Sequence, residues 1–234
     1  MSEPRIVSRE EWERERRELL AEEKAAARAL DALAEKRRAL PWIRIDQNYT
    51  FHTTNGVASL ADLFGDYSQL IVQHIMFDPA WDAACPICSF WADGYNPMIT
   101  HLKQRDVAFV GVSRAPLLKI TEYRERMGWS FDWVSSHGSS FNYDFGVSAS
   151  EADQARGTMT YNYADSPVHV NELHGTSVFA RDPASSEIFH TYSTYARGLD
   201  RMNAAYGYLD LLPKGRDESA LPFPLAWVKR HDEY

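Results

Sequence analysis

Residues 75–94 read IMFDPAWDAACPICSFWADG, and this stretch decides the fold. The apolar run QLIVQHIMF, residues 69–77, predicts a buried strand. After a short loop, a helix is expected to begin near Cys85, with Pro86 at its first position, where a missing N–H is tolerated. Because residues i and i+3 share one face of a helical turn, the sulfurs of Cys85 and Cys88 can meet. A Cys-x-x-Cys between a strand and a helix favours a redox-active pair.

The two cysteines are expected to have different roles. At a helix N-terminus, free backbone N–H groups and the helix dipole lower the pKa of a thiol, and only the thiolate attacks a disulfide. Cys85 is therefore the predicted nucleophile, and Cys88, one turn further in, is the predicted resolving thiol. Asp78 and Asp82 precede the pair and carry charge that opposes the thiolate.

Two other roles for the cysteines stay open at this point. Cysteine is among the most buried residue types, so the pair could be inert core. Zinc could use two thiolates and two histidines, but none of the 8 histidines, including His101, His169 and His174, falls at a zinc-finger spacing. We therefore predict no metal and no cofactor. His74, inside the predicted strand, is interpreted as a core histidine rather than a base.

The elements around this stretch predict an α/β protein with a mixed sheet flanked by helices. Asn55-Gly56 indicates a tight turn between two extended runs. Residues 136–175 show no clear period and are interpreted as insertion and loop. The further predicted elements are strands 106–112 and 131–135, helix 115–129, a hairpin of 176–181 with 187–195, and a last helix 199–213.

The N-terminal segment predicts one long helix over residues 8–40. Ser8 and Glu11 have capping-box spacing, strong helix formers follow, and Pro41 marks the end. The predicted domains are a helical extension, 1–41, and a thiol-bearing domain, 42–234.

Such a helix would be roughly 50 Å long at 1.5 Å per residue, and its apolar stripe is thin. An isolated helix of this kind depends on packing for its stability. We therefore expect it to break within residues 21–31, or to reach a second subunit and form a homodimer. In either case Trp12 and Leu19 would anchor it.

Composition excludes several function classes. The chain has 234 residues and a net charge of −8, which is a poor match for nucleic-acid phosphates. No apolar run approaches the roughly 18 residues of a membrane span. The charged N-terminus shows no secretory signal, so a reducing, cytoplasmic location is expected.

Several strings resemble a bacterial family of uncharacterised proteins described as predicted dithiol–disulfide oxidoreductases of the thioredoxin-like superfamily. They cover nearly the whole chain, and VSRAPLLKI and RMGW are far more specific than the Cys-x-x-Cys. The strings are LADLFG, ACPICSFWADG, HLKQRDVAFVGVSRAPLLKI, RMGWSFDWVSS, FNYDFGVS and the terminal WVKRHDEY, together with the N-terminal helix. The resemblance implies a thioredoxin-like fold and suggests thiol chemistry.

The hairpin that precedes the predicted strand also resembles the peroxiredoxin branch of that superfamily. Peroxiredoxins carry a PxxxTxxC motif, in which the proline lies seven residues before the cysteine and the Thr or Ser lies three before it. Here Pro79 lies six residues before Cys85, and Asp82 stands in place of the Thr or Ser. The arginine that helps to bind peroxide usually precedes a late strand, where this chain has His174 and Gly175. Thioredoxins place a cis-proline near that position, which Thr176 is expected to occupy here.

The function that follows is thiol–disulfide exchange by Cys85 and Cys88 on a protein or small-molecule disulfide. The alternatives are a non-catalytic thioredoxin-fold binding module and a weak thiol peroxidase. The aromatic residues near the cysteines, Trp81, Phe90, Trp91 and Trp129, are interpreted as core packing rather than as the lining of a substrate groove. The residues assigned to substrate binding are Trp81, Pro86, Trp91 and Thr176.

Overall fold

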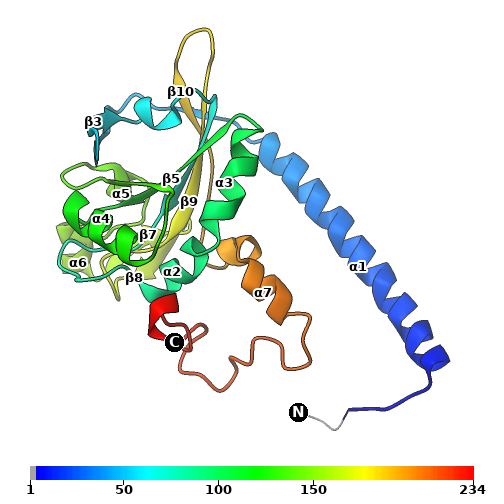
Figure 1. Cartoon of the computed structure of the whole chain (residues 1–234). Helices are drawn as coiled ribbons and strands as arrows, with labels where there is room; N and C mark the ends of the chain where they lie inside the picture. The colour runs from blue at the N-terminus through cyan, green and yellow to red at the C-terminus, as the bar shows by residue number, and fades with distance from the viewer. Residues whose placement is uncertain (1–3) are drawn as a thin grey trace. The chain divides into compact units, whose positions relative to one another are not determined.

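The computed structural model describes residues 4–234 and divides the chain into two compact units (Figure 1). The first unit ends at Pro41, and the second runs from Trp42 to Tyr234. Helix α1 (Arg9–Arg38) forms the first unit, and the second holds the sheet and the other helices. No helix within residues 4–234 is long and apolar enough to cross a membrane.

Helix α1 is continuous, so the expected break within residues 21–31 is wrong. The Ser8 side chain accepts a hydrogen bond from the Glu11 N–H at 3.2 Å and caps the first turn. Pairs such as Arg9 with Glu13, 2.9 Å apart, stabilise exposed helix by a few tenths of a kcal/mol each. The alanine-rich centre continues the helix because alanine has the highest helix propensity.

Eight strands form one mixed sheet in the order β1-β10-β9-β4-β5-β6-β2-β3. Strands β4, β5 and β6 are parallel, β9 is antiparallel to β4, and β10 is antiparallel to β9. The β2–β3 hairpin joins the other edge through β6. The strands are β1 (Ile43–Arg44), β2 (Thr50–Thr53), β3 (Gly56–Ser59), β4 (Gln69–His74), β5 (Val107–Ser113), β6 (Asp132–Ser135), β9 (Gly175–Arg181) and β10 (Ile188–Tyr195).

The order β5-β4-β9-β10 is the thioredoxin fold: two parallel strands joined through helices, then an antiparallel hairpin against the first strand. The β2–β3 hairpin, which precedes β4 in the chain, extends the sheet beyond β6. The predicted fold class, an α/β thioredoxin-like mixed sheet with a long N-terminal helix, is confirmed. The hairpin's two-residue loop is Thr54-Asn55, one residue earlier than predicted, because Thr53 pairs with Gly56.

Two segments differ from the sequence expectations. The stretch 136–175 is not a loop, because it holds two short helices and a second, two-stranded sheet. The predicted helix 199–213 is instead a 3-10 turn, Ala196–Met202, followed by a short helix. The elements not yet given are α2 (Pro86–Ala92), α3 (Tyr95–Lys103), α4 (Leu117–Arg126), α5 (Phe141–Asp144), α6 (Glu151–Arg156), α7 (Ala204–Leu209), β7 (Thr158–Tyr161) and β8 (Ala164–Pro167).

Apolar side chains pack in two clusters, one on each face of the sheet. Side chains alternate along β5, so Phe109 belongs to one cluster, and Ala108 and Val110 belong to the other. Buried residues of α2, α3 and α4 pack in the cluster of Phe109, and Cys88 is one of them. The start of α2 is therefore held against the closely packed core of the domain.

Candidate active site

Cys85 and Cys88 lie where the chain passes from β4 into α2, and both are free thiols. Cys85 is the N-cap residue of α2, and Pro86 is its first helical residue, as predicted. The Cys85 N–H donates to the Met76 carbonyl at 3.0 Å, and the Met76 N–H donates to the Cys88 Sγ at 3.4 Å. Met76 therefore holds both cysteines with its two backbone groups.

The surroundings separate the two thiols by acidity. A hydrogen bond from Cys88 lowers the pKa of Cys85 to about 7, against the opposing effect of burial. The backbone N–H groups of Cys88 and Ile87 and the charge of Arg230 lower this pKa further. The same pairing with Cys85, together with burial, raises the pKa of Cys88 well above its usual 9.0. Cys85 is half-buried and Cys88 is buried, so the more acidic thiol is also the more accessible one.

The loop that leads into Cys85 is fixed by helix α4. The Lys119 ammonium donates to the carbonyl of Pro79 at 3.0 Å and to that of Trp81 at 2.8 Å. Within the loop, buried Asp78 accepts a hydrogen bond from the Ala80 N–H at 2.8 Å. One lysine therefore satisfies two carbonyls that the turn leaves without strand partners.

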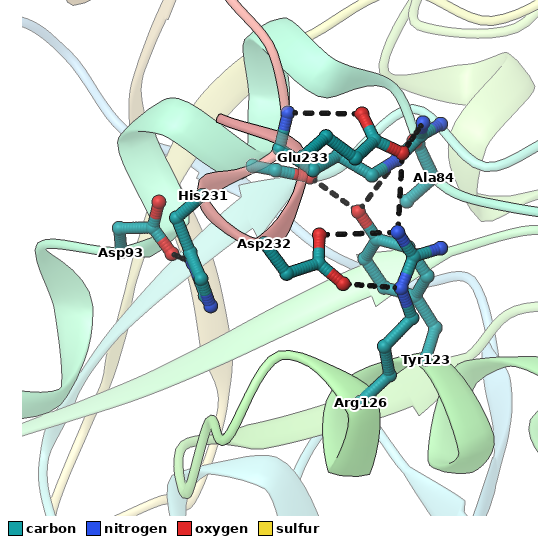
Figure 2. A network of polar contacts seen from close by, with 9 residues as sticks. Ala84, Asp93, Tyr123, Arg126, His231, Asp232 and Glu233 are labelled. Atoms are coloured by element: carbon teal, nitrogen blue, oxygen red, sulfur yellow. Dashed lines mark hydrogen bonds and ion pairs between the residues drawn. The ribbon is translucent and has the colours of Figure 1, made fainter.

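The end of the chain docks beside α2 and α4, as Figure 2 shows. The Arg126 guanidinium binds both oxygens of Asp232, at 2.7 and 3.1 Å, and also contacts Glu233 at 3.1 Å. The His231 ring lies 2.6 Å from the Asp93 carboxylate. The strings RMGW and WVKRHDEY contain Arg126, His231, Asp232 and Glu233, but the sequence alone assigns these residues no role, because ion pairs between distant segments leave no local pattern.

The residues assigned to substrate binding are not equally accessible. Trp81 and Pro86 are half-buried and flank Cys85 in the chain. Trp91 is buried, and its indole N–H donates to the Leu199 carbonyl at 3.0 Å. The structure therefore gives Trp91 a packing role, because neither its rings nor its N–H is open to a substrate.

Thr176 lies in β9 and is also buried. Its hydroxyl donates to the Gln73 side-chain oxygen on β4 at 2.7 Å. No cis peptide bond occurs among residues 4–234, so the position carries no counterpart of the thioredoxin cis-proline. The hydroxyl links two strands, and that hydrogen bond leaves it no free hydrogen to donate to a substrate.

The histidines show no arrangement suited to metal binding. His74 is buried, its ring contacts the Ser177 hydroxyl at 2.9 Å, and burial lowers its pKa to about 3, as fits a core histidine. Among the described residues, no group of three or more His, Cys, Asp or Glu is arranged to hold a metal ion.

A second buried polar cluster follows β5. The Arg114 guanidinium pairs with Glu172, with 2.8 Å between Nε and Oε1, and the Ser148 hydroxyl donates to the same carboxylate at 2.7 Å. Burial raises the pKa of Glu172 to about 7, although Arg114 and Ser148 oppose this shift. Arg114 also lines a cavity of about 370 Å³ with Pro79 and Tyr143.

Several solved structures with a similar course of the chain are peroxiredoxins. Peroxiredoxin Q of Xanthomonas campestris, in its structure LUss, has a TM-score of 0.44 and 12% identity, over 74% of this chain and 96% of that one. Peroxidoxin BcpB of Mycobacterium tuberculosis has a TM-score of 0.42 and 14% identity, over 70% and 93%. A cysteine mutant of PrxQ from Xylella fastidiosa has a TM-score of 0.42 and 12% identity, over 71% and 95%.

No curated protein matches this chain in sequence. A family model does match, and it covers residues 1–234. It therefore spans both the helical extension and the domain that carries the cysteines. The chain belongs to the bacterial protein family of unknown function DUF899.

Proposed function

We propose that this protein is a thiol–disulfide oxidoreductase that uses Cys85 and Cys88 as its dithiol. The observation that carries the proposal is the difference between the two thiols. Cys85 is half-buried at the start of α2 with a pKa of about 7, and Cys88 is buried behind it with a raised pKa. An accessible acidic thiol beside a buried, less acidic one is what a nucleophile and a resolving thiol require.

The reaction has two exchange steps. The Cys85 thiolate attacks one sulfur of a substrate disulfide, forms a mixed disulfide, and releases the other substrate sulfur as a thiolate. Cys88 then loses its proton and attacks the Cys85 sulfur, which closes the Cys85–Cys88 disulfide and releases the second substrate thiol. Two electrons pass from the protein to the substrate. A low-molecular-weight or protein dithiol must supply two electrons to restore the protein.

The accessible surface around Cys85 favours a substrate that presents its disulfide on an exposed segment. Cys85, Pro86 and Ile87 are all half-buried, and so is Trp81 in the preceding loop. These residues offer apolar contact beside the nucleophile, which suits a protein or small-molecule disulfide. We assign substrate contact to Trp81 and Pro86.

A redox titration with mass spectrometry tests the proposal. We expect wild-type protein, equilibrated with thiol–disulfide buffers and then alkylated, to show one two-electron transition that removes both free thiols together. With a test disulfide, Cys88→Ser should stop at a mixed disulfide on Cys85, and Cys85→Ser should form none. The proposal is wrong if both thiols stay free in buffers that oxidise dithiothreitol, or if Cys85→Ser forms the mixed disulfide instead.

A further inference from the structure

The guanidinium of Arg230 reaches the backbone of the active-site loop from the end of the chain. Its Nη2 donates to the Ala84 carbonyl at 2.8 Å, and its Nε donates to the Tyr123 hydroxyl at 3.0 Å. Ala84 is fully buried and directly precedes Cys85. Its carbonyl lies outside α2, so Arg230 is the group that satisfies this buried acceptor.

From Tyr123 the hydrogen bonds continue to the other side of Cys85. The Ser89 hydroxyl donates to the Cys85 carbonyl at 3.0 Å, and this uses its only hydrogen. The Tyr123 hydroxyl, 2.8 Å from Ser89, must therefore donate to Ser89 while it accepts from Arg230. Arg230 thus holds the peptide group before Cys85 directly, and it holds the peptide group after Cys85 through the hydroxyls of Tyr123 and Ser89. In this series of hydrogen bonds each group donates to the next, from Arg230 to the Cys85 carbonyl.

The position of Arg230 is itself fixed by the last residues of the chain. Its Nη1 donates to Glu233 at 2.9 Å, and Glu233 also contacts Arg126 on α4. Figure 2 shows Asp232 and Glu233 facing Arg126 and Tyr123, with His231 turned toward Asp93. The Arg230 side chain is only 18% exposed, so its charge is poorly screened by water.

We infer that Arg230 is a positioning residue for Cys85, which fixes the two peptides around the nucleophile and holds a positive charge beside its thiolate. The inference rests on the proposed function, because it assigns Arg230 to the same thiol chemistry. It makes the C-terminal segment, residues 228–234, part of the active site.

The electrostatics agree with this geometry. The charge of Arg230 is one of the causes that lower the pKa of Cys85, after the hydrogen bonds from Cys88 and the backbone. The other charged and titratable groups around the site are Asp78, Asp82, Cys88, Lys119, Tyr123, Arg126, Asp232 and Glu233. Of these, Glu233 pairs directly with Arg230 and so offsets its charge.

Charge variants of the full-length, reduced protein test the inference. The readout is the pKa of Cys85, taken from its alkylation rate against pH with the labelled residue identified by mass spectrometry. We expect Arg230→Gln to raise this pKa by roughly half a pH unit to one unit, since an adjacent opposite charge is worth about that or more. Arg230→Lys, which keeps the charge, should restore at least half of the shift.

Lys229→Gln is the matched control, because Lys229 is the exposed neighbour of Arg230 and its loss changes the net charge equally. It should leave the pKa of Cys85 unchanged. Glu233→Gln should lower that pKa by a few tenths of a unit, because it removes the charge that offsets Arg230. General loosening of the segment would not produce shifts of opposite sign in Arg230→Gln and Glu233→Gln.

The inference is overturned if Arg230→Gln leaves the pKa of Cys85 unchanged, or if Lys229→Gln shifts it equally. If Arg230→Gln does not fold, Glu233→Gln decides alone: a lower pKa supports the inference, and an unchanged or higher pKa refutes it. The redox titration of the wild-type chain is a separate readout. A disulfide that forms normally beside an unchanged pKa refutes this inference and leaves the proposed function standing.

Discussion

Replacing Glu172 by glutamine should change how the stability of the protein depends on pH. The side chain of Glu172 is only 1% exposed, and burial raises its pKa from 4.5 to about 7. Because the folded-state value lies above the unfolded one, Glu172 contributes its full stability below pH 4.5 and loses it as the pH rises through about 7. Stability attributable to this group therefore falls as the solution becomes more alkaline.

The two pKa values set the size of the effect. Each pH unit between them costs about 1.4 kcal/mol, with the slope flattening near each end. From about pH 5 to about pH 8, the free energy of unfolding of the wild type should fall by about 2.5 kcal/mol relative to that of Glu172→Gln. The comparison cancels the other titrating groups, including the buried histidines, because both proteins contain them.

Urea unfolding of both proteins at several pH values measures this difference. Glu151→Gln is the matched control, because it removes an exposed carboxylate from α6, and its curve should run parallel to that of the wild type. Parallel curves for wild type and Glu172→Gln would refute the reasoning. Such a result would mean that Arg114, 2.8 Å from the carboxylate, keeps Glu172 ionised across the whole range.

Three further predictions concern the thiols, metals and α1. At neutral pH the alkylation of Cys85 should outpace that of Cys88, because its pKa is about 7; peptide mapping that finds Cys88 labelled first would contradict this. Elemental analysis of protein purified without chelator should find no stoichiometric zinc, and a metal-to-chain ratio near one would overturn that expectation. Trp12 and Leu19 are 58% and 51% exposed, so we expect the protein to self-associate through α1. The double substitution Trp12→Glu and Leu19→Glu should abolish this association. Light scattering that shows a full-length monomer at high concentration would disprove the association through α1.

The central elements could be predicted from the sequence because each has a local pattern. The apolar run predicts β4, and the alternation of side chains predicts β5. The proline at the first helical position predicts the start of α2. The positions of the two cysteines follow from the predicted start of α2, because that start decides which cysteine is the N-cap residue. Predicted strand boundaries differ from the observed ones where pairing between strands decides them. Strand β4 ends at His74, although the Ile75 N–H still donates a hydrogen bond to the Val112 carbonyl.

The segment 136–175 could not be predicted because its signals are unusual. The β7–β8 hairpin turns at Asn162-Tyr163, both with positive φ, 51° and 64°. Glycine would mark such a turn in a sequence, whereas tyrosine does not. The burial of Trp91 and Thr176 could not be predicted for a related reason: proximity in sequence or strand position does not reveal burial, and tertiary packing places both in the core.

Three of the strings that carry the family resemblance make contacts at or next to the cysteine loop. VSRAPLLKI supplies Lys119, which holds the carbonyls of residues 79 and 81. RMGW supplies Arg126, which binds the Asp232 and Glu233 of the terminal string, and that string supplies Arg230 for the Ala84 carbonyl. VSRAPLLKI and the terminal string thus hold carbonyls of the loop directly, and RMGW holds the terminal string. The specificity of these strings has a physical reason: a Cys-x-x-Cys needs only two residues, whereas this arrangement of contacts needs residues from three distant segments.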